Sequence, residues 1–446
     1  MLDFSLLLAV LASIALLLLL ILRLKLPAFL SLLLASIALG ILTNIPAQNI
    51  LKTLQEGMGG TLGFVATVVG LGTLLGGMLE HSGGAQVLAQ RLLHAFGKKN
   101  TSWALMCTGF ILAIPVFFDV AFILLVPLVY SLQRKTGKSI LTYGLPLLAG
   151  LAITHAFIPP TPGPVAVAEI LQANLGWVIF FGFIVGIPTA IVSGPIFSNY
   201  ISTKIHVEAP QLLKNEVEIK ATIRLQEVFL VVGLPLILIV STTLIKSLGG
   251  DQVLPSTVVY VLQLLGHPFG ALLLANLAAW FLLGRRQGIP ANTLQEIANR
   301  SMAPAGMIIL LTGAGGTFKQ MLITTAAGKM IAEVIANQGI PLLLFAFLAA
   351  VVIRLLQGSA TVAMITAAGL TAPLVGSDWT APKKALLVLA IAAGASILSH
   401  VNDSGFWLVS QYLGLNERQT FQSWSVMTLL VAMVGFISVC LLFLAV

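Results

Sequence analysis

Charged side chains are scarce in this sequence: Asp, Glu, Lys and Arg make up only 9% of its 446 residues, whereas 58% of the residues are hydrophobic. Soluble globular domains carry roughly 25% charged residues, so this composition excludes an ordinary soluble protein. Apolar runs of about 18 or more residues recur along the chain, and each is long enough to cross a hydrocarbon core of roughly 30 Å. The sequence therefore predicts an all-α, polytopic membrane protein.

Other absences narrow the function further. Only two cysteines are present, Cys107 and Cys440, and both lie in apolar runs, which indicates packing residues. The chain contains no His-Glu-x-x-His or Gly-x-Ser-x-Gly motif and no nucleotide-binding loop, so neither an enzyme nor an ATP-driven pump is expected. Residues 4–22 lack a basic n-region and a cleavage site, which favours a first span over a signal peptide. The net charge of +8 comes from Lys and Arg in short loops, a pattern that orients membrane proteins and does not indicate nucleic-acid binding.

Two long apolar segments are interrupted near their centres. The segment over residues 101–132 contains Pro115 and Asp119, and the segment over residues 341–375 contains Gly358-Ser359. Basic residues flank the first segment at both ends, so both ends are expected on the cytoplasmic side. We therefore predict a re-entrant hairpin in each segment, with arms of about 14 residues that rise roughly 21 Å and do not cross.

Each predicted hairpin is followed by a helix that has to break. Pro159–Pro164 places four prolines within the helix predicted over residues 141–175, and proline does not propagate an α-helix. The helix predicted over residues 385–414 is interrupted by the polar stretch Asn402–Gly405. Interrupted segments in corresponding places of two halves indicate the binding site of a transporter.

An internal repeat relates the two halves. Gly70–Met78 resembles Gly313–Met321, and His155 corresponds to His400 at nearly the same separation. With five crossings, one hairpin and one broken helix in each repeat, the second repeat must insert upside down, so the repeats are inverted and both termini lie outside. The predicted units are a first repeat over residues 1–201, a cytoplasmic linker over residues 202–225 and a second repeat over residues 226–446. Residues 59–79 and 258–283 are among the predicted spans.

The turn of the second predicted hairpin supplies the first candidate site. Gln357-Gly358-Ser359-Ala-Thr361 is typical of a turn followed by a new helix N-terminus, with Ser359 or Thr361 as the cap. Backbone N–H groups at such an end bind an anion without help from a charged side chain. The alternative is that the small residues only permit close helix packing.

Polar residues close to this turn complete the predicted substrate site. Arg354 lies near mid-depth, where an unpaired arginine is costly, so it either clamps a substrate carboxylate or pairs permanently with an acid such as Asp403. Asn402, Asp403 and Ser404 offer amide, carboxylate and hydroxyl groups that suit a hydroxyl-rich substrate or a coupling cation; an acidic helix cap is the alternative. The mirror position in the first broken helix is occupied by Thr161, Gly163 and the carbonyl groups of the proline run.

Three ionisable residues are candidates for proton coupling. Aromatic and apolar neighbours penalise the charged form of Asp119, so its carboxyl is expected to bind and release a proton, unless it is locked in a salt bridge with Arg354. His155 and His400 titrate near neutrality, although a buried neutral histidine bonded to a carbonyl group is the commoner case. His155, His400 and Asp403 as metal ligands of an intramembrane enzyme are a further alternative, but no motif supports it, and no metal or cofactor is expected.

Five motifs occur in order along the chain, and together they cover both halves. They are Gly57–Phe64, Phe117–Ala121, Gly266–Phe269, Gln357–Ala363 and Ser399–Trp407. These motifs resemble those of the gluconate permease (gluconate:proton symporter) family over essentially the whole chain. The resemblance implies proton-driven uptake of gluconate or a related sugar acid through a bacterial inner membrane, and a fold with two hairpins and inverted repeats. Thr161 stands where many relatives have histidine, so proton handling or substrate choice could differ here.

The resemblance also sets the expected partners. These are a gluconate-like organic anion, the lipid bilayer and a second copy of the chain in a homodimer. Nucleic acid is not an expected partner. The alternatives are an H⁺- or Na⁺-coupled carrier of another small carboxylate, such as glycerate, D-serine or a dicarboxylate, and a channel. Hairpins paired with broken helices suit alternating access better than a channel.

Overall fold

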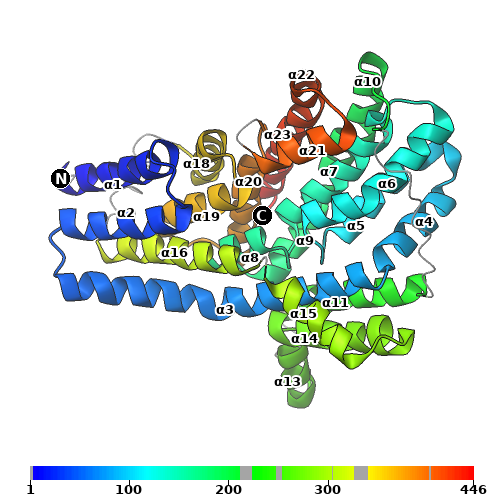
Figure 1. Ribbon diagram of the computed structural model, residues 1–446. Coiled ribbons are helices and arrows are strands. Elements are labelled where there is room, and N and C mark those ends of the chain that lie inside the picture. Colours follow the sequence, from blue (N-terminus) through cyan, green and yellow to red (C-terminus); the bar gives the residue numbers. More distant parts are fainter. Residues whose placement is uncertain (1–3, 211–222, 248–253, 304, 326–339, 401–402) are drawn as a thin grey trace.

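The computed structural model describes residues 4–210, 223–247, 254–303, 305–325, 340–400 and 403–446 (Figure 1). These residues are almost entirely helical and include no β-strand, which confirms the predicted all-α class. The helices before residue 211 are α1 (Phe4–Leu22), α2 (Ala28–Leu42), α3 (Ala47–His81), α4 (Gly84–Phe96), α5 (Thr101–Leu112), α6 (Phe118–Thr136), α7 (Leu141–Phe157), α8 (Pro162–Ile170), α9 (Leu175–Ile191) and α10 (Phe197–Lys204). The later helices are α11 (Leu225–Ser247), α13 (Ser256–Leu265), α14 (Pro268–Ala279), α15 (Ala291–Met302), α16 (Ala305–Thr324), α18 (Leu342–Gln357), α19 (Ala360–Thr371), α20 (Ala381–Ala395), α21 (Ser404–Leu413), α22 (Glu417–Thr420) and α23 (Val426–Phe443).

Proline marks the start of many of these helices. It has no N–H to leave unpaired and its fixed φ suits the entry into a helix. The proline N-caps are Pro27, Pro46, Pro255, Pro290 and Pro341. The same property shortens the predicted proline break: Pro162 and Pro164 lie in the first turn of α8, so only residues 158–161 interrupt the helix.

The two interrupted helices form the centre of the molecule. Nearly every residue of α7 and of the second half of α20 is buried. Helix α5 packs against α7, and α18 packs against α20 in the same way. Glycine allows both close approaches, because a Cβ at Gly150 would lie 2.2 Å from the carbonyl oxygen of Met106, and one at Gly394 would lie 2.3 Å from that of Phe347.

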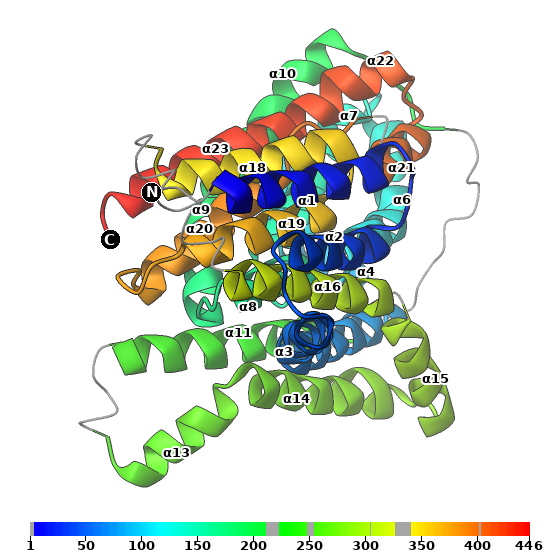
Figure 2. The ribbon, with the colours of Figure 1, turned by 90° about the vertical axis from the view of Figure 1, so that its left-hand side faces the viewer.

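Long apolar helices surround this centre. Figure 2 shows α3 end-on between α16 and α14, and α3 packs against both. Six helical stretches of the described residues are long and apolar enough to cross a membrane: Ala47–His81, Leu141–Ile170, Leu175–Lys204, Leu225–Lys246, Pro268–Gln287 and Glu417–Phe443. Large apolar side chains are exposed on the outer helices, for example Ile41, Ile237 and Leu277, as expected for a surface that faces lipid.

Three helix boundaries differ from the sequence prediction. Helix α3 begins at Ala47 and not near Gly59, because its polar first turns continue the helix and carry an i,i+4 pair between Lys52 and Glu56 (3.8 Å). The helix predicted over residues 258–283 is divided at Gly266-His267, since Pro268 starts α14. The second break starts earlier than predicted, because α20 ends at Ala395 and residues 396–400 lie outside the helices, whereas α21 begins at Ser404, within the predicted break. The predicted helix pairs at 101–132 and 341–375 exist as α5–α6 and α18–α19; their re-entrant course, the inversion of the repeats and the orientation of the termini and linker stay predictions.

Candidate functional site

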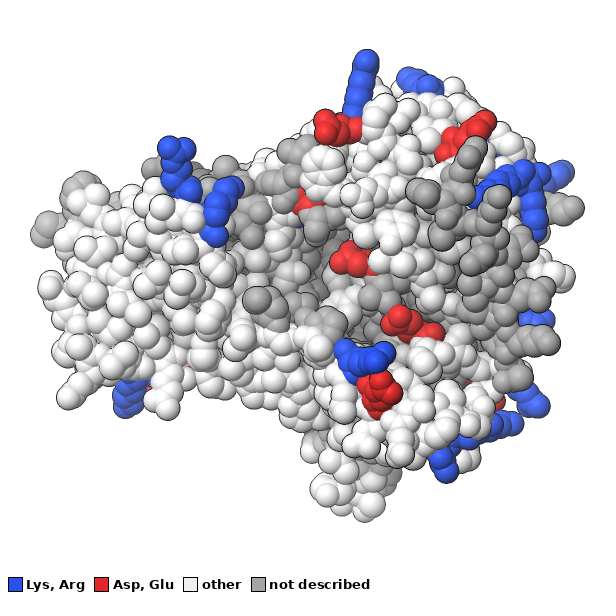
Figure 3. All heavy atoms as spheres, in the orientation of Figure 1, with Lys and Arg blue, Asp and Glu red and all other residues white. Residues whose placement is uncertain are grey.

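A cavity of about 460 Å³, called here the central cavity, lies between the two helix pairs and the two broken helices. The molecular face in Figure 3 is hollowed near its middle, and acidic side chains lie around this hollow. Four helix N-termini reach the wall of the central cavity. The residues that bring them there are Phe118 and Asp119 of α6, Gly163 of α8, Ser359–Thr361 at the start of α19, and Asp403 and Gly405 at the start of α21. Because the N-terminus is the positive end of the helix dipole, this arrangement favours negative charge in the cavity.

The N-terminus of α19 is the one of these four that combines free N–H donors with no carboxylate of its own. Gly358 ends α18 in the left-handed region (φ 86°), where glycine is favoured. Ser359 is the N-cap, and its hydroxyl accepts a hydrogen bond from the Val362 N–H (3.3 Å), which confirms the predicted cap. The N–H groups of Ala360 and Thr361 lie in the first turn, where a helix offers them no partner, and both residues line the central cavity.

The other three N-termini are less suited to a ligand carboxylate. Helix α6 carries Asp119 in its first turn, and Asp403 caps α21 by accepting a hydrogen bond from the Gly405 N–H (3.1 Å). Helix α8 has Pro162 and Pro164 in its first turn, and proline has no N–H to donate.

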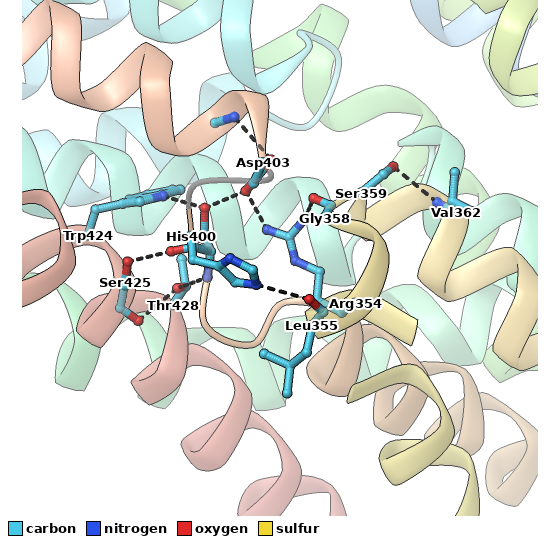
Figure 4. Close-up of polar contacts among 12 residues, drawn as sticks. Arg354, Leu355, Gly358, Ser359, Val362, His400, Asp403, Trp424, Ser425 and Thr428 are labelled. Atoms are coloured by element: carbon cyan, nitrogen blue, oxygen red, sulfur yellow. Dashed lines mark hydrogen bonds and ion pairs between the residues drawn. The ribbon is translucent and has the colours of Figure 1, made fainter. Parts of the chain in front are cut away.

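Arg354 is held by two partners and is almost completely buried. Its Nη2 lies 2.5 Å from Oδ2 of Asp403, and the exposed fractions of the two side chains are 6% and 13%. Its Nη1 donates to the carbonyl oxygen of Gly358. Figure 4 shows the guanidinium group between the turn of the α18–α19 pair and Asp403. Two roles were predicted for Arg354, a clamp on the substrate carboxylate and a permanent pair with an acid; the structure shows a pair with Asp403, and the permanence of this pair stays a prediction. The predicted alternative of a salt bridge between Arg354 and Asp119 is absent from the described residues.

Ser399 connects this ion pair to α23, and sequence reasoning did not single it out. Its hydroxyl donates to Oδ2 of Asp403 and accepts a hydrogen bond from Nε1 of Trp424 (2.7 Å). Its N–H donates to Oγ1 of Thr428 (2.9 Å), and its carbonyl oxygen accepts from the Ser425 hydroxyl. Trp424 and Ser425 belong to a π-helical turn, Phe421–Ser425, a local distortion that is often found at functional sites.

His400 has a structural partner. Its Nε2 lies 3.0 Å from the carbonyl oxygen of Leu355, which can only accept, so this nitrogen donates (Figure 4). This contact joins the second break to the last turn of α18. It matches the ordinary alternative for a buried histidine, and His400 is not among the residues that line the central cavity.

The first half of the chain contributes a different set of groups. Asp119 is exposed to the central cavity, and no hydrogen bond or ion pair to it is found among the described residues. His155 lines the same cavity beside Phe117, and its Nδ1 is buried without a hydrogen-bond partner in the described part of the chain. Thr161 instead lines a small adjoining cavity behind His155, and its hydroxyl donates to the carbonyl oxygen of Ile158 (2.6 Å).

The remaining predicted residues divide into two groups. Gly163 lines the central cavity, and a Cβ there would lie 2.7 Å from Sδ of Met364. Asn402 lies outside the described residues, as do the side chains of Gln357 and Ser404. Ser399 lies in a motif that the sequence displays, whereas Trp424 and Thr428 lie more than twenty residues farther on, with no local signal that connects them to the break.

A multi-pass helical protein with broken helices and an anion-favouring central cavity belongs to the class of membrane transporters. The family model of the GntP family permeases matches residues 5–445, and the chain belongs to this family.

Individual relatives agree with this family. The chain is 39% identical over 446 residues to a gluconate permease of Pseudomonas aeruginosa, with 99% of this chain and 98% of that protein covered. It is 35% identical to a low-affinity gluconate transporter of Escherichia coli (97% and 96% covered) and 37% identical to the Gnt-II system L-idonate transporter of that organism (96% and 97% covered). The predicted family is confirmed, and the chain is a permease and not an enzyme.

Solved structures support the fold independently. The YdaH transporter of Alcanivorax borkumensis superposes with a TM-score of 0.64 at 14% identity, over 90% of this chain and 89% of that one. The MtrF efflux pump of Neisseria gonorrhoeae superposes with a TM-score of 0.59 at 17% identity, over 89% and 84%. At such low identity the likeness concerns the arrangement of the helices alone.

Proposed function

We propose that this permease takes up gluconate or a related sugar acid through the bacterial inner membrane, by alternating access and in symport with protons. The names of its relatives support the substrate class, because they are gluconate and L-idonate transporters. The central cavity, at about 460 Å³, has a volume usual for small-ligand sites, roughly 300–1,000 Å³. The observation that carries the proposal is the uncovered N-terminus of α19 on the wall of that cavity.

The substrate carboxylate binds at the first turn of α19. The N–H groups of Ala360 and Thr361 donate to it, and the helix dipole adds to the attraction. Arg354 acts on this site indirectly, because its contact with the Gly358 carbonyl oxygen fixes the turn that precedes the N-cap Ser359. Arg354 is therefore a positioning residue, and its own charge is already compensated by Asp403.

The hydroxyl groups of the substrate extend across the cavity. Thr361, Ser396 and Thr428 line it and carry hydroxyl groups. Ser396 and Thr428 already donate to the carbonyl oxygens of Ala392 and Ser425, so their hydroxyl oxygens are placed to accept hydrogen bonds from a polyol. Apolar residues such as Met364 and Val431 form the rest of the wall. Asn402 and Ser404 stay candidates for hydroxyl contacts on the strength of the sequence.

Asp119 is the proposed proton carrier. Asp403 accepts hydrogen bonds from Arg354, Ser399 and Gly405, so a proton added to this carboxylate would compete with three established donors. Asp119 has no such partner in the described residues and is exposed to the cavity, so protonation costs it no established contact. His155, whose Nδ1 has no hydrogen-bond partner in the described part of the chain, is the second candidate. His400 is engaged with Leu355 and is the third.

A charge placed at the start of α19 tests the binding site. Ala360→Asp puts a carboxylate where the substrate anion is proposed to bind, and an acidic residue in the first turn also stabilises the helix. We expect this variant to fold and to lose binding of labelled gluconate, whereas Ala360→Asn, of nearly the same shape, retains it. Wild-type affinity of folded Ala360→Asp would refute this placement.

Transport in proteoliposomes tests substrate and coupling. Labelled gluconate should accumulate under an imposed inward proton gradient and not under a sodium gradient. Competition by unlabelled L-idonate, glycerate and D-serine ranks the related substrates. Accumulation that follows the sodium gradient alone would mean that sodium, and not the proton, is the coupling ion. If unlabelled gluconate does not compete with the labelled gluconate, the proposed substrate class would be wrong.

A further inference from the structure

A second cavity, of about 400 Å³, lies apart from the central cavity and is called here the outer cavity. Its wall is formed by the turn between α8 and α9, by the end of α11 and by the break between α13 and α14. This break contains the motif Gly266–Phe269, which has no contact with the central site. A Cβ at Gly266 would lie 1.8 Å from Oγ1 of Thr242, so glycine is what allows the break to pack against α11.

The groups around the outer cavity are held in place by local hydrogen bonds. Oδ1 of Asn174 accepts from the Gly176 N–H (2.9 Å) and from the Thr243 hydroxyl (3.2 Å), which fixes the turn before α9 to α11. Nδ1 of His267 accepts from the Phe269 N–H (3.3 Å), and its ring packs edge-on against Phe269, 4.7 Å between centroids. The imidazole is thereby oriented, and Nε2 has no hydrogen-bond partner among the described residues.

The charged groups of this wall come from different elements. Lys246 of α11 and His267 of the α13–α14 break both line the cavity, and the lysine charge acts on the imidazole ring; Lys246 has no ion-pair partner in the part of the chain that the structure describes. Glu169 of α8, which interacts with Lys319 of α16 and with Gln172, also lines the cavity. A lysine and an imidazole together with a carboxylate and amide groups match a ligand with an anionic end and a hydroxyl-bearing end.

The position of the outer cavity relates it to the transport path. Helix α11 begins beside the linker predicted to be cytoplasmic and ends at the cavity; in this predicted orientation the cavity lies on the side from which a nutrient arrives. Helix α8 connects the two cavities: Gly163 lines the central one and Glu169, six positions later, lines the outer one. This separation corresponds to about 9 Å along the helix.

We propose that the outer cavity is a second binding site for a small hydroxy-acid anion, which holds the substrate before it passes to the central cavity. Lys246 and His267 receive the carboxylate, and Glu169, Gln172 and Gln263 bind the hydroxyl groups. This inference rests on the proposed function, because the ligand is the same sugar acid.

Protection of a cysteine tests the site directly. In a chain with Cys107 and Cys440 replaced by alanine, Gln263→Cys places a thiol at the outer cavity. Tyr260→Cys is the control: it lies on the same helix, is 67% exposed and does not line the cavity. We expect gluconate to slow maleimide labelling of Gln263→Cys several-fold, and to leave Tyr260→Cys unchanged. Sorbitol, which lacks the carboxylate, should not protect.

Two added variants separate the outer site from the central one. Protection should persist when Ala360→Asp blocks the central site, and should be lost with Lys246→Gln. Protection that disappears with Ala360→Asp would overturn the proposal, because the signal would then come from the central site. Equal protection by sorbitol, or no protection by gluconate, would also overturn it.

Lipid provides another source of anions, and the assay distinguishes it. Labelling is compared in phosphatidylcholine vesicles with and without phosphatidylglycerol. If the anionic lipid alone blocks the thiol and gluconate has no effect, the cavity is a headgroup site and the proposal falls. The proposed function is tested separately by gluconate uptake of the parent chain, so a failure of either one can be recognised without the other.

Discussion

The two halves of this permease present similar frames with different polar groups. In each half a helix pair packs against a broken helix through glycine, and in each half residues next to the break line the central cavity: His155 and Gly163 in the first, Ser396 and Asp403 in the second. The first half brings a proline-rich helix start and Asp119, for which the described residues provide no ion pair or hydrogen bond. The second half brings Arg354, Asp403 and Ser399, joined in one hydrogen-bonded network.

This difference suggests a division of labour between the halves. A network with satisfied charges is rigid, because each member would lose a partner by moving. It is suited to holding an anion at the start of α19 in a constant geometry. A carboxyl without fixed partners is suited to changing its protonation. Two halves with the same helix arrangement can thus have different roles, one in substrate binding and the other in ion coupling.

The largest expected effect concerns membrane topology. In the cysteine-free background, Lys99→Cys and Lys135→Cys at the two ends of the α5–α6 pair should be labelled from the same side of the membrane. Ile340→Cys and Asp378→Cys at the ends of the α18–α19 pair should both be labelled from the opposite side. Labelling of the two ends of one pair from different sides would mean that the pair crosses the membrane, and the inverted repeat would be wrong.

Asp119→Asn should abolish accumulation and preserve exchange. The amide keeps the volume of the protonated carboxyl but cannot release a proton. We expect counterflow of labelled gluconate to continue while uptake driven by a pH gradient falls to equilibration. If Asp119→Asn still accumulates gluconate with the wild-type dependence on the pH gradient, His155 becomes the residue to test.

Asp403→Asn should destabilise the protein, because it leaves the guanidinium group of Arg354 buried without its counter-charge. Removal of one partner of a buried pair costs about 3–5 kcal/mol. The double variant Arg354→Gln/Asp403→Asn should recover part of this loss, which thermal unfolding in detergent would measure. Asp378→Asn, at an exposed carboxylate, is the control and should unfold like the parent. If Asp403→Asn unfolds at the same temperature as the parent chain, a stabilising ion pair between Arg354 and Asp403 would be contradicted.

Trp424→Phe should have the smallest effect. The phenyl ring preserves the packing on Phe118, 5.7 Å between centroids, and only the hydrogen bond to Ser399 is lost, worth about 1 kcal/mol. We expect a several-fold weaker apparent affinity for gluconate at a nearly unchanged maximal exchange rate. Trp177→Phe, at the start of α9 and outside this hydrogen-bonded network, controls for the loss of an indole. The same change in both variants would argue against a role of Ser399.

The sequence by itself determined the features that depend on neighbours along the chain. Apolar length predicted the membrane helices, because lipid leaves the backbone no other partners. Gly358 and Ser359 predicted the helix end and the new cap, since both signals act within one turn. The same locality led to errors: the polar start of α3 looked like a loop, and Pro268 within an apolar run was not recognised as a helix start.

Only the tertiary structure decided which polar groups meet. Arg354 had several possible acids, and the packing of α18 against the second broken helix selected Asp403, whereas Asp119 has no ion pair within the described ranges. Trp424 reaches Ser399 from α23, and Lys246 meets the wall of the outer cavity from α11, although nothing in the adjacent residues marks either one. In an apolar interior each polar group needs a partner, and the sequence predicts this need. It does not predict which residue is the partner, because that depends on distances between helices that are far apart along the chain.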